Sequence, residues 1–183
     1  MIEVRFHGRG GQGAVTSAEL MAQTAIGSGK YAQAFPSFGP ERRGAPVTAF
    51  LRISDKPIRI REKVYSPNVV VVLDPSVMKV AKVDAGLKDD GLLIINSAHP
   101  AESIRRQYGF KQKIATIDAL TIALEILKAP ITNTVMMGSL SKAMGVAAPA
   151  DVREPLLNRF GPTLAARNQE AFERAYENTK VEG

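Results

Sequence analysis

Short strand-like runs alternate with segments of helical periodicity along most of the chain. Strands are predicted at residues 1–6, 31–35, 69–73, 91–96 and 113–118. Two of these, 69–73 and 91–96, are almost wholly apolar, which is typical of parallel strands buried on both faces of a sheet. Strand formers at 47–53, a turn at 54–56 and a returning run at 57–60 predict a β-hairpin. Its basic side chains alternate and are predicted to share one solvated or partner-facing surface: Arg52, Arg59 and Arg61.

Apolar residues at three- and four-residue spacing predict helices between the strands. In the first, residues 14–27, the apolar side chains share one face, so this helix should pack on the sheet. Shorter helices are expected at 76–88, 100–107 and 119–128. The segment 132–146 combines small residues with three methionines, which predicts a buried or subunit-contacting helix. Two amphipathic helices, 152–160 and 162–180, are predicted to close the chain.

The order of these elements predicts an α/β fold. We expect a Rossmann-like three-layer domain with a mixed, mostly parallel sheet and an inserted β-hairpin. The 183 residues are enough for a core of their own, and no internal repeat or low-complexity linker divides them. One domain over residues 1–183 is therefore the expectation.

A glycine-rich stretch follows the first predicted strand and precedes the first predicted helix. Its residues are Gly8, Arg9, Gly10, Gly11, Gln12 and Gly13. Glycines let a backbone turn tightly and approach a pyrophosphate, and the unpaired N–H groups of a first helical turn attract anions. The spacing also fits the dinucleotide fingerprint. The alternative is a tight strand-to-helix turn without a ligand.

The second predicted strand argues against NAD. An NAD-binding unit needs an acidic residue about 20 positions after the loop to hold the ribose hydroxyls, but the strand ends in Ala34-Phe35-Pro36-Ser37. The charged residues that follow are Glu41, Arg42 and Arg43. Arginines there suit a phosphorylated ribose, as in NADP or coenzyme A, because guanidinium binds phosphate with paired donors. Alternatively, Glu41 forms an internal ion pair with the arginines.

Composition narrows the chemistry of the chain. It has no cysteine, so its own thiolates can hold neither an iron–sulfur cluster nor zinc. Two histidines, His7 and His99, are the imidazoles available, and a metal site is not expected. Asp74 and Asn96 follow buried strands, where open sheets bind ligands, but helix capping is the favoured interpretation for both.

Charge and hydropathy indicate the setting in which the protein works. Residues 1–63 carry ten Lys and Arg against five Asp and Glu, whereas residues 64–183 carry fourteen against thirteen. The basic surplus thus shares the region of the glycine stretch, which an anionic ligand or an acidic partner would explain; the alternative is a solvated basic face, which is common in proteins. No nucleic-acid motif is present, so nucleic acid is not expected as a partner. The absence of a signal sequence or membrane-spanning run predicts a cytoplasmic protein.

Two motifs together resemble one family. The stretch 8–13, followed by Ser37-Phe38-Gly39-Pro40-Glu41-Arg42-Arg43-Gly44-Ala45-Pro46-Val47, is similar to the gamma subunit of the 2-oxoacid:ferredoxin oxidoreductases, the pyruvate synthase group. The resemblance continues through residues 52–58, through Asn133 with Gly138, and through 168–176. It therefore covers essentially the whole chain.

The resemblance implies a place in a larger enzyme. Members form complexes of alpha, beta, gamma and delta subunits, or one fused chain. The complexes decarboxylate a 2-oxoacid on thiamine diphosphate with Mg, pass electrons through 4Fe-4S clusters to ferredoxin, and transfer the acyl group to coenzyme A. This chain lacks the Gly-Asp-Gly with a downstream Asn that anchors thiamine diphosphate in such enzymes, and 89–91 is the nearest string. The implication is a chain that is inactive alone, without catalytic residues, whose partners carry these cofactors.

For this chain the resemblance implies a supporting role at the coenzyme A step. The expected coenzyme-binding residues are Gly8, Arg9, Gly10, Gly11, Gln12, Gly13, Ser37, Glu41, Arg42, Arg43 and Gly44. Gly44-Ala45-Pro46 resembles the pyruvate or branched-chain type rather than the 2-oxoglutarate type. The alternative function is a free-standing NADP-dependent reductase that uses the glycine stretch with Arg42 and Arg43.

Overall fold

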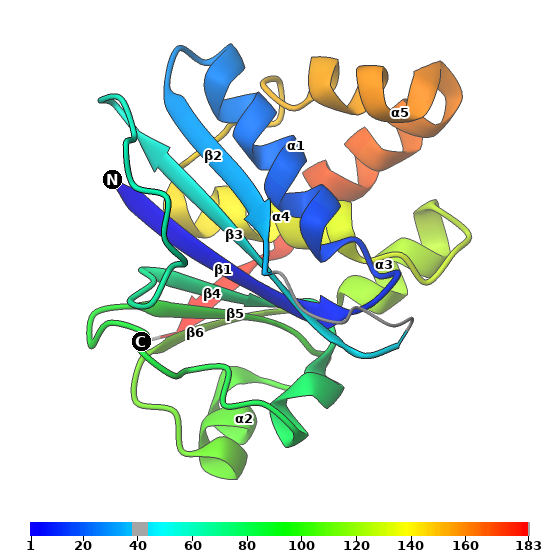
Figure 1. The fold of residues 1–183 in the computed structure, drawn as a ribbon. Coiled ribbons are helices and arrows are strands. Elements are labelled where there is room, and N and C mark those ends of the chain that lie inside the picture. The colour runs from blue at the N-terminus through cyan, green and yellow to red at the C-terminus, as the bar shows by residue number, and fades with distance from the viewer. Residues whose placement is uncertain (38–43, 183) are drawn as a thin grey trace.

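The computed structural model describes residues 1–37 and 44–182, in which seven strands form one mixed sheet in the order β2-β3-β1-β4-β5-β6-β7 (Figure 1). Their bounds are β1 (Ile2–Arg9), β2 (Tyr31–Pro36), β3 (Pro46–Ser54), β4 (Val69–Val72), β5 (Leu92–Asn96), β6 (Lys113–Ile117) and β7 (Lys180–Glu182). Strands β1, β4, β5 and β6 run parallel, whereas β3 is antiparallel to both β1 and β2, and β7 is antiparallel to β6.

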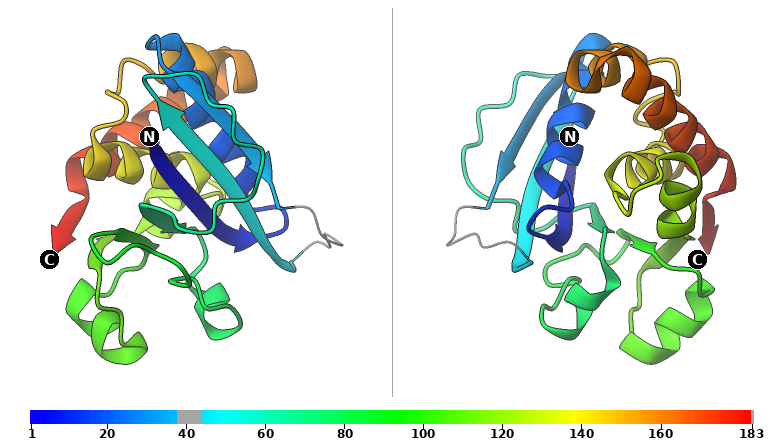
Figure 2. Two further views of the ribbon diagram at one scale, coloured as in Figure 1. Left: turned by 60° about the vertical axis from the view of Figure 1, so that its left-hand side comes forward. Right: turned by 90° about the vertical axis from the view of Figure 1, so that its right-hand side faces the viewer.

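Helices cover both faces of this sheet, which confirms the three-layer prediction (Figure 2). One face packs against α1 (Ala14–Gly27), α3 (Ala119–Ile126), α4 (Asn133–Met144) and α5 (Arg153–Asn178). The other packs against the 3-10 helix η1 (Pro75–Lys79) and α2 (Ala101–Tyr108). Within the predicted helix 76–88, the helical part is thus limited to η1.

The buried strands explain why two predicted runs were continuously apolar. In β4, Val69 and Val71 join the core beneath α1, whereas Val70 and Val72 join the core on the α2 side. Strand β5 alternates in the same way, and all five of its residues are buried. Because successive side chains of a strand point to opposite faces, a strand covered on both sides needs apolar residues throughout.

The predicted hairpin partner was wrong. Residues 57–60 form no strand, and β3 pairs instead with β1 and with β2, where Tyr31 lies opposite Ser54 and Pro36 opposite Ala49. Pro57 has no N–H to give to a ladder, and both edges of β3 are already occupied. The hairpin of this fold is therefore β2 with β3. Strand β3 lies between β2 and β1, so the end of β2 is not adjacent to the strand that leads into the glycine stretch. An acidic residue at the end of β2 would therefore not be placed to hold a ribose.

Arg52 also departs from its prediction. Its side chain is only 1% exposed, and its Nε donates to Oε1 of Glu3 at 2.8 Å. The guanidinium also lies over the ring of Phe35, 5.4 Å from its centroid. Arg59 and Arg61 are exposed as expected. Arg52 differs because it lies on a strand with a neighbour on each side, opposite a carboxylate that supplies the countercharge.

The C-terminal region follows the prediction closely. The helix α4 is buried over most of its length. The span α5 consists of two helical segments that meet at Gly161, whose φ of 72° and ψ of 171° interrupt the helix. Phe172 and Tyr176 stack with ring centroids 6.4 Å apart. The chain then adds β7 to the edge of the sheet, a strand that the sequence did not predict.

Candidate functional site: the glycine loop

The glycine loop, residues 8–13, connects the end of β1 to the start of α1. Gly11 and Gly13 have φ angles of 91° and 83°, in the left-handed region that side-chain-bearing residues avoid. A Cβ on Gly13 would also lie 2.8 Å from Nδ2 of Asn133, at the start of α4. Glycine at position 13 is therefore required both by the backbone and by the close approach of α4.

Gln12 fixes the shape of the loop. The side-chain Oε1 of Gln12 accepts a hydrogen bond from the backbone N–H of Arg9 at 2.7 Å. The backbone N–H of Gln12 donates to the carbonyl of Arg9 at 3.0 Å. Its Nε2 donates to Oδ2 of Asp74 at 2.6 Å. The side chain thus spans from the loop to the carboxyl end of β4.

Asp74 is the anchor on the neighbouring strand. It caps η1, since its Oδ1 accepts from the N–H of Ser76 at 2.8 Å, so the capping interpretation of Asp74 is confirmed. Burial raises the pKa of Asp74, but hydrogen bonds from Gln12 and Ser76 and the charge of Arg9 outweigh that effect. The pKa of the carboxyl is consequently below its ordinary value, and Asp74 is ionised at neutral pH.

Arg9 holds neighbouring segments together. Its Nε donates to Oγ of Ser76 at 2.8 Å and lies 3.7 Å from Oδ2 of Asp74. Its Nη1 donates to the carbonyl of Gly44 at 2.9 Å. Much of this guanidinium is thus directed at groups within the chain, and its charge is balanced in part by Asp74.

The structure brings Gly44 to the glycine loop but keeps Ser37 on a strand ladder. The N–H of Gly10 donates to the carbonyl of Ala45 at 2.9 Å, and the N–H of Gly44 donates to Gly10 at 3.3 Å. Ser37 extends the pairing of β2 with β3, donating its N–H to Thr48 at 2.8 Å. The predicted residues Glu41, Arg42 and Arg43 lie outside the described residues.

A pocket of about 260 Å³ opens at the N-terminus of α1. The glycine loop, the first helical residues and β3 contribute its lining: Arg9, Gly10, Gly11, Gly13, Ala14, Val15, Thr16 and Val47. The first turn of α1 has no acidic residue. Among the described residues, none caps this turn with a side-chain hydrogen bond. Because the N–H groups of a first turn lack acceptors within their helix and carry partial positive charge, this pocket suits an anionic group.

Asn96 plays a structural role at the start of a helix, although this helix is not the next one along the chain. Its Nδ2 donates to the carbonyl of Leu73 at 2.9 Å, and its Oδ1 accepts from the N–H of Ala119 at 3.0 Å. It therefore joins the ends of β4 and β5 to the first residue of α3 rather than to α2. The side-chain cap of α3 is Asp118, which sequence reasoning had assigned to a strand.

His7 faces Arg5 on the same strand. The Nε of Arg5 donates to Nε2 of His7 at 3.1 Å. Burial, followed by the charge of Arg5, lowers the pKa of His7 from 6.5 to about 4, so the imidazole is neutral at pH 7. Among the residues that the structure describes, no group of three or more His, Asp or Glu side chains could hold a metal ion.

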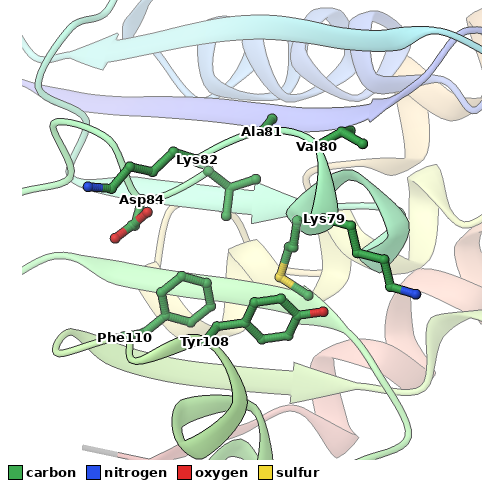
Figure 3. A pocket seen from close by; sticks show the side chains of 9 residues that line it. Lys79, Val80, Ala81, Lys82, Asp84, Tyr108 and Phe110 are labelled. Atoms are coloured by element: carbon green, nitrogen blue, oxygen red, sulfur yellow. The ribbon is translucent and has the colours of Figure 1, made fainter.

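A second pocket, of about 350 Å³, lies on the opposite face of the sheet, between residues 78–84 and the end of α2 (Figure 3). The rings of Tyr108 and Phe110 stack beneath it with centroids 5.6 Å apart. Lys79 and Lys82 stand at its rim. Sequence reasoning missed this pocket because no motif marks it and its two sides are distant in the chain.

A family model described as pyruvate ferredoxin/flavodoxin oxidoreductase matches residues 3–178. The chain belongs to this family. It is 53% identical over 182 residues to the pyruvate/ketoisovalerate oxidoreductases common subunit gamma of Pyrococcus furiosus, an alignment that covers 99% of this chain and 98% of the relative. The chain is accordingly a gamma-type subunit of a pyruvate:ferredoxin oxidoreductase complex, as its motifs indicated.

One solved structure supports the same assignment, and a more distant one shares the fold. The pyruvate oxidoreductase subunit PORC of Thermotoga maritima superposes with a TM-score of 0.89 at 37% identity and covers 100% of this chain and 98% of that chain. The 2-oxoglutarate:ferredoxin oxidoreductase of Magnetococcus marinus shares the fold with a TM-score of 0.78 at 20% identity. That match covers 96% of this chain and 30% of the longer protein.

The alternative of a free-standing NADP-dependent reductase finds no support in these comparisons. The T. maritima protein is a subunit of a pyruvate oxidoreductase, and the P. furiosus protein is a shared subunit of pyruvate and ketoisovalerate oxidoreductases. In the described parts of the chain, no helix is both long and apolar enough to cross a lipid bilayer.

Proposed function

We propose that this gamma-type subunit supports the binding of coenzyme A in a complex that oxidises pyruvate or a branched-chain 2-oxoacid. In this proposal the whole chain acts as one gamma-type domain that supplies no catalytic residue. Alpha, beta and delta subunits carry thiamine diphosphate, Mg and the 4Fe-4S clusters, and ferredoxin accepts the electrons. A cytoplasmic location remains a prediction from the sequence.

The pocket at the N-terminus of α1 is the observation that carries this proposal. It offers first-turn N–H groups and a glycine backbone that permits close approach, with no carboxylate in the first turn of the helix. Such a site fits the phosphates of coenzyme A, whose thiol accepts the acyl group made elsewhere in the complex. The M. marinus relative of the same fold was solved with coenzyme A and succinyl-CoA bound, which supports the choice of ligand.

The surrounding residues take two different roles in this proposal. Gln12, Asp74 and Arg9 hold the loop in shape, because their polar groups are directed at one another and at the backbone of Gly44. The backbone of Gly10, Gly11 and Gly13 would then contact the phosphates. Ser37, Glu41, Arg42 and Arg43 are proposed to contribute to the same coenzyme site, as the family resemblance implied.

Thr16 provides a test that leaves the fold intact. It lines the pocket in the first turn of α1, where a glutamate stabilises a helix but repels a phosphate. In the reconstituted complex, Thr16→Glu should raise the Michaelis constant for coenzyme A about ten-fold, with little change in that for the oxoacid. The uncharged Thr16→Gln is the matched control.

Arg42→Ala and Arg43→Ala test the second part of the site in the same assay. Each should raise the Michaelis constant for coenzyme A if these arginines bind its phosphates. A constant for coenzyme A that stays at the wild-type value in Thr16→Glu and in both arginine variants would overturn the proposal.

A further inference from the structure

A bend in α5 forms a groove on the outside of the molecule. The two helical segments of α5 meet at Gly161 and Pro162 at an angle that is visible in Figure 1. Gly161 has a φ of 72°, and Pro162 has no N–H to continue the ladder of the preceding segment. The groove has a volume of about 450 Å³ and is lined by Arg153, Leu157, Pro162, Ala165, Ala166, Gln169, Glu170 and Glu173.

The lining comes from one stripe on each helical segment. Arg153 and Leu157 are four residues apart on the first, and the remaining positions recur at three- and four-residue spacing on the second. On the second segment Phe172 and Ala175 belong to the core, and Ala165 lies at the border between the core and the groove. Leu157 is 49% exposed, so the groove presents an aliphatic side chain that the described residues leave uncovered.

The lining of the groove carries two carboxylates, Glu170 and Glu173, against one cation, Arg153, and is therefore net negative. Glu173 is half-buried, and its carboxylate accepts from Nε2 of Gln169 at 2.7 Å without an ion pair to any described cation. Glu170 lies 3.5 Å from Arg174, whose other Nη is closer to Glu125, at 2.7 Å. A cationic side chain from a partner would therefore be attracted to the two carboxylates.

We propose that this groove is the docking site for another subunit of the oxidoreductase complex. The docking segment would place an aliphatic side chain beside Leu157, Ala165 and Ala166. It would place a lysine or arginine against Glu170 and Glu173. The net negative lining contrasts with the chain as a whole, whose net charge is +6, so a basic segment would be attracted to the groove rather than to the surface in general.

The experiment uses the complex assembled by co-expression, with an affinity tag on a different subunit. The double charge reversal Glu170→Lys/Glu173→Lys should weaken retention of this chain about ten-fold or more, because two attractive contacts become repulsive. The amide variant Glu170→Gln/Glu173→Gln keeps the side-chain shape and should weaken it less. Ala166→Arg, which fills the groove floor, should also release the chain.

Glu102→Lys is the matched control. Glu102 is an exposed helical glutamate paired with an arginine four residues away, but it lies on α2, away from the groove. This variant should retain wild-type association. The proposal would be overturned by wild-type retention in the reversal and in Ala166→Arg. It would equally be overturned if these variants changed only self-association of this chain, which would make a second copy the occupant.

Discussion

Gln12 and Asp74 lie 62 positions apart in the sequence, and a hydrogen bond of 2.6 Å joins Nε2 of Gln12 to Oδ2 of Asp74. The same carboxylate caps η1, and the same glutamine holds the backbone of Arg9. One pair of side chains thus couples the shape of the glycine loop to the end of the neighbouring strand. The loop is preformed by this contact, which reduces the ordering cost of binding a ligand there.

Gln12→Glu should destabilise the fold in a pH-dependent way. At neutral pH it places a second carboxylate against Asp74, and we expect a loss of about 2 kcal/mol and a melting temperature lower by about 4–8 °C. As the pH falls towards 4, the introduced carboxyl becomes protonated and can donate to Asp74, so the penalty should shrink. Gln12→Met, which removes the hydrogen bond without adding charge, should show a smaller penalty that changes less with pH. Thermal melts from pH 4 to 8 measure both, and an equal penalty at all pH values would contradict the charge argument.

The glycine loop could be predicted from sequence because its signal is local. Glycine spacing and the flanking periodicities all lie within about 25 residues, and the same holds for the buried runs that became β4 and β5. The contact between Gln12 and Asp74 could not be predicted, because it depends on which strand lies beside β1. Likewise, residues 57–60 resembled a strand by composition, but the partner of β3 was already fixed by its pairing with β1 and β2.

The sequence also could not show which of the charged side chains would be buried. Arg52, Arg59 and Arg61 follow one alternating pattern, yet only Arg52 is buried, because Glu3 stands opposite it on the adjacent strand. In the candidate site, family resemblance indicated the residue set, whereas the structure showed that Arg9 and Gln12 are engaged within the chain. Neither distinction is encoded in spacing along the sequence.

His7 should make the protein less stable in mild acid. Its pKa is about 4 in the folded chain and 6.5 as an ordinary histidine, so the unfolded state binds a proton first as the pH falls. Stability that is fully present above pH 6.5 should therefore decline between pH 6.5 and 4, by no more than about 3 kcal/mol. His7→Gln keeps an acceptor for Arg5 but does not titrate, and denaturant midpoints should vary less with pH in this variant over that window. The exposed His99→Gln is the control and should follow the wild type.

Glu3 and Arg52 should respond unequally to single substitutions. Arg52→Met leaves Glu3, whose side chain is 18% exposed and can be hydrated, whereas Glu3→Met leaves a guanidinium that is 1% exposed without its partner. We expect Glu3→Met to cost more, about 3–5 kcal/mol, and Arg52→Met to cost less. The double variant should recover much of the loss, because it buries no unpaired charge. Urea denaturation of all four proteins tests this order, and additive losses in the double variant would show that the two side chains are not coupled.

Gly138 sets the distance between α4 and α5. A Cβ at this position would collide with the backbone oxygen of Phe172 and would lie 3.1 Å from Cβ of Ala175. A backbone carbonyl cannot move aside as the tip of a flexible side chain can, so α5 itself would have to shift. Gly138→Ala should therefore lower the stability by about 2 kcal/mol even though alanine favours the helix, with a melting temperature lower by about 4–8 °C. The matched control is Gly27→Ala at the end of α1, where no atom lies within 4 Å of the added Cβ and stability should be unchanged or slightly raised. If Gly138→Ala were as stable as this control, close packing at Gly138 would not determine how the two helices meet.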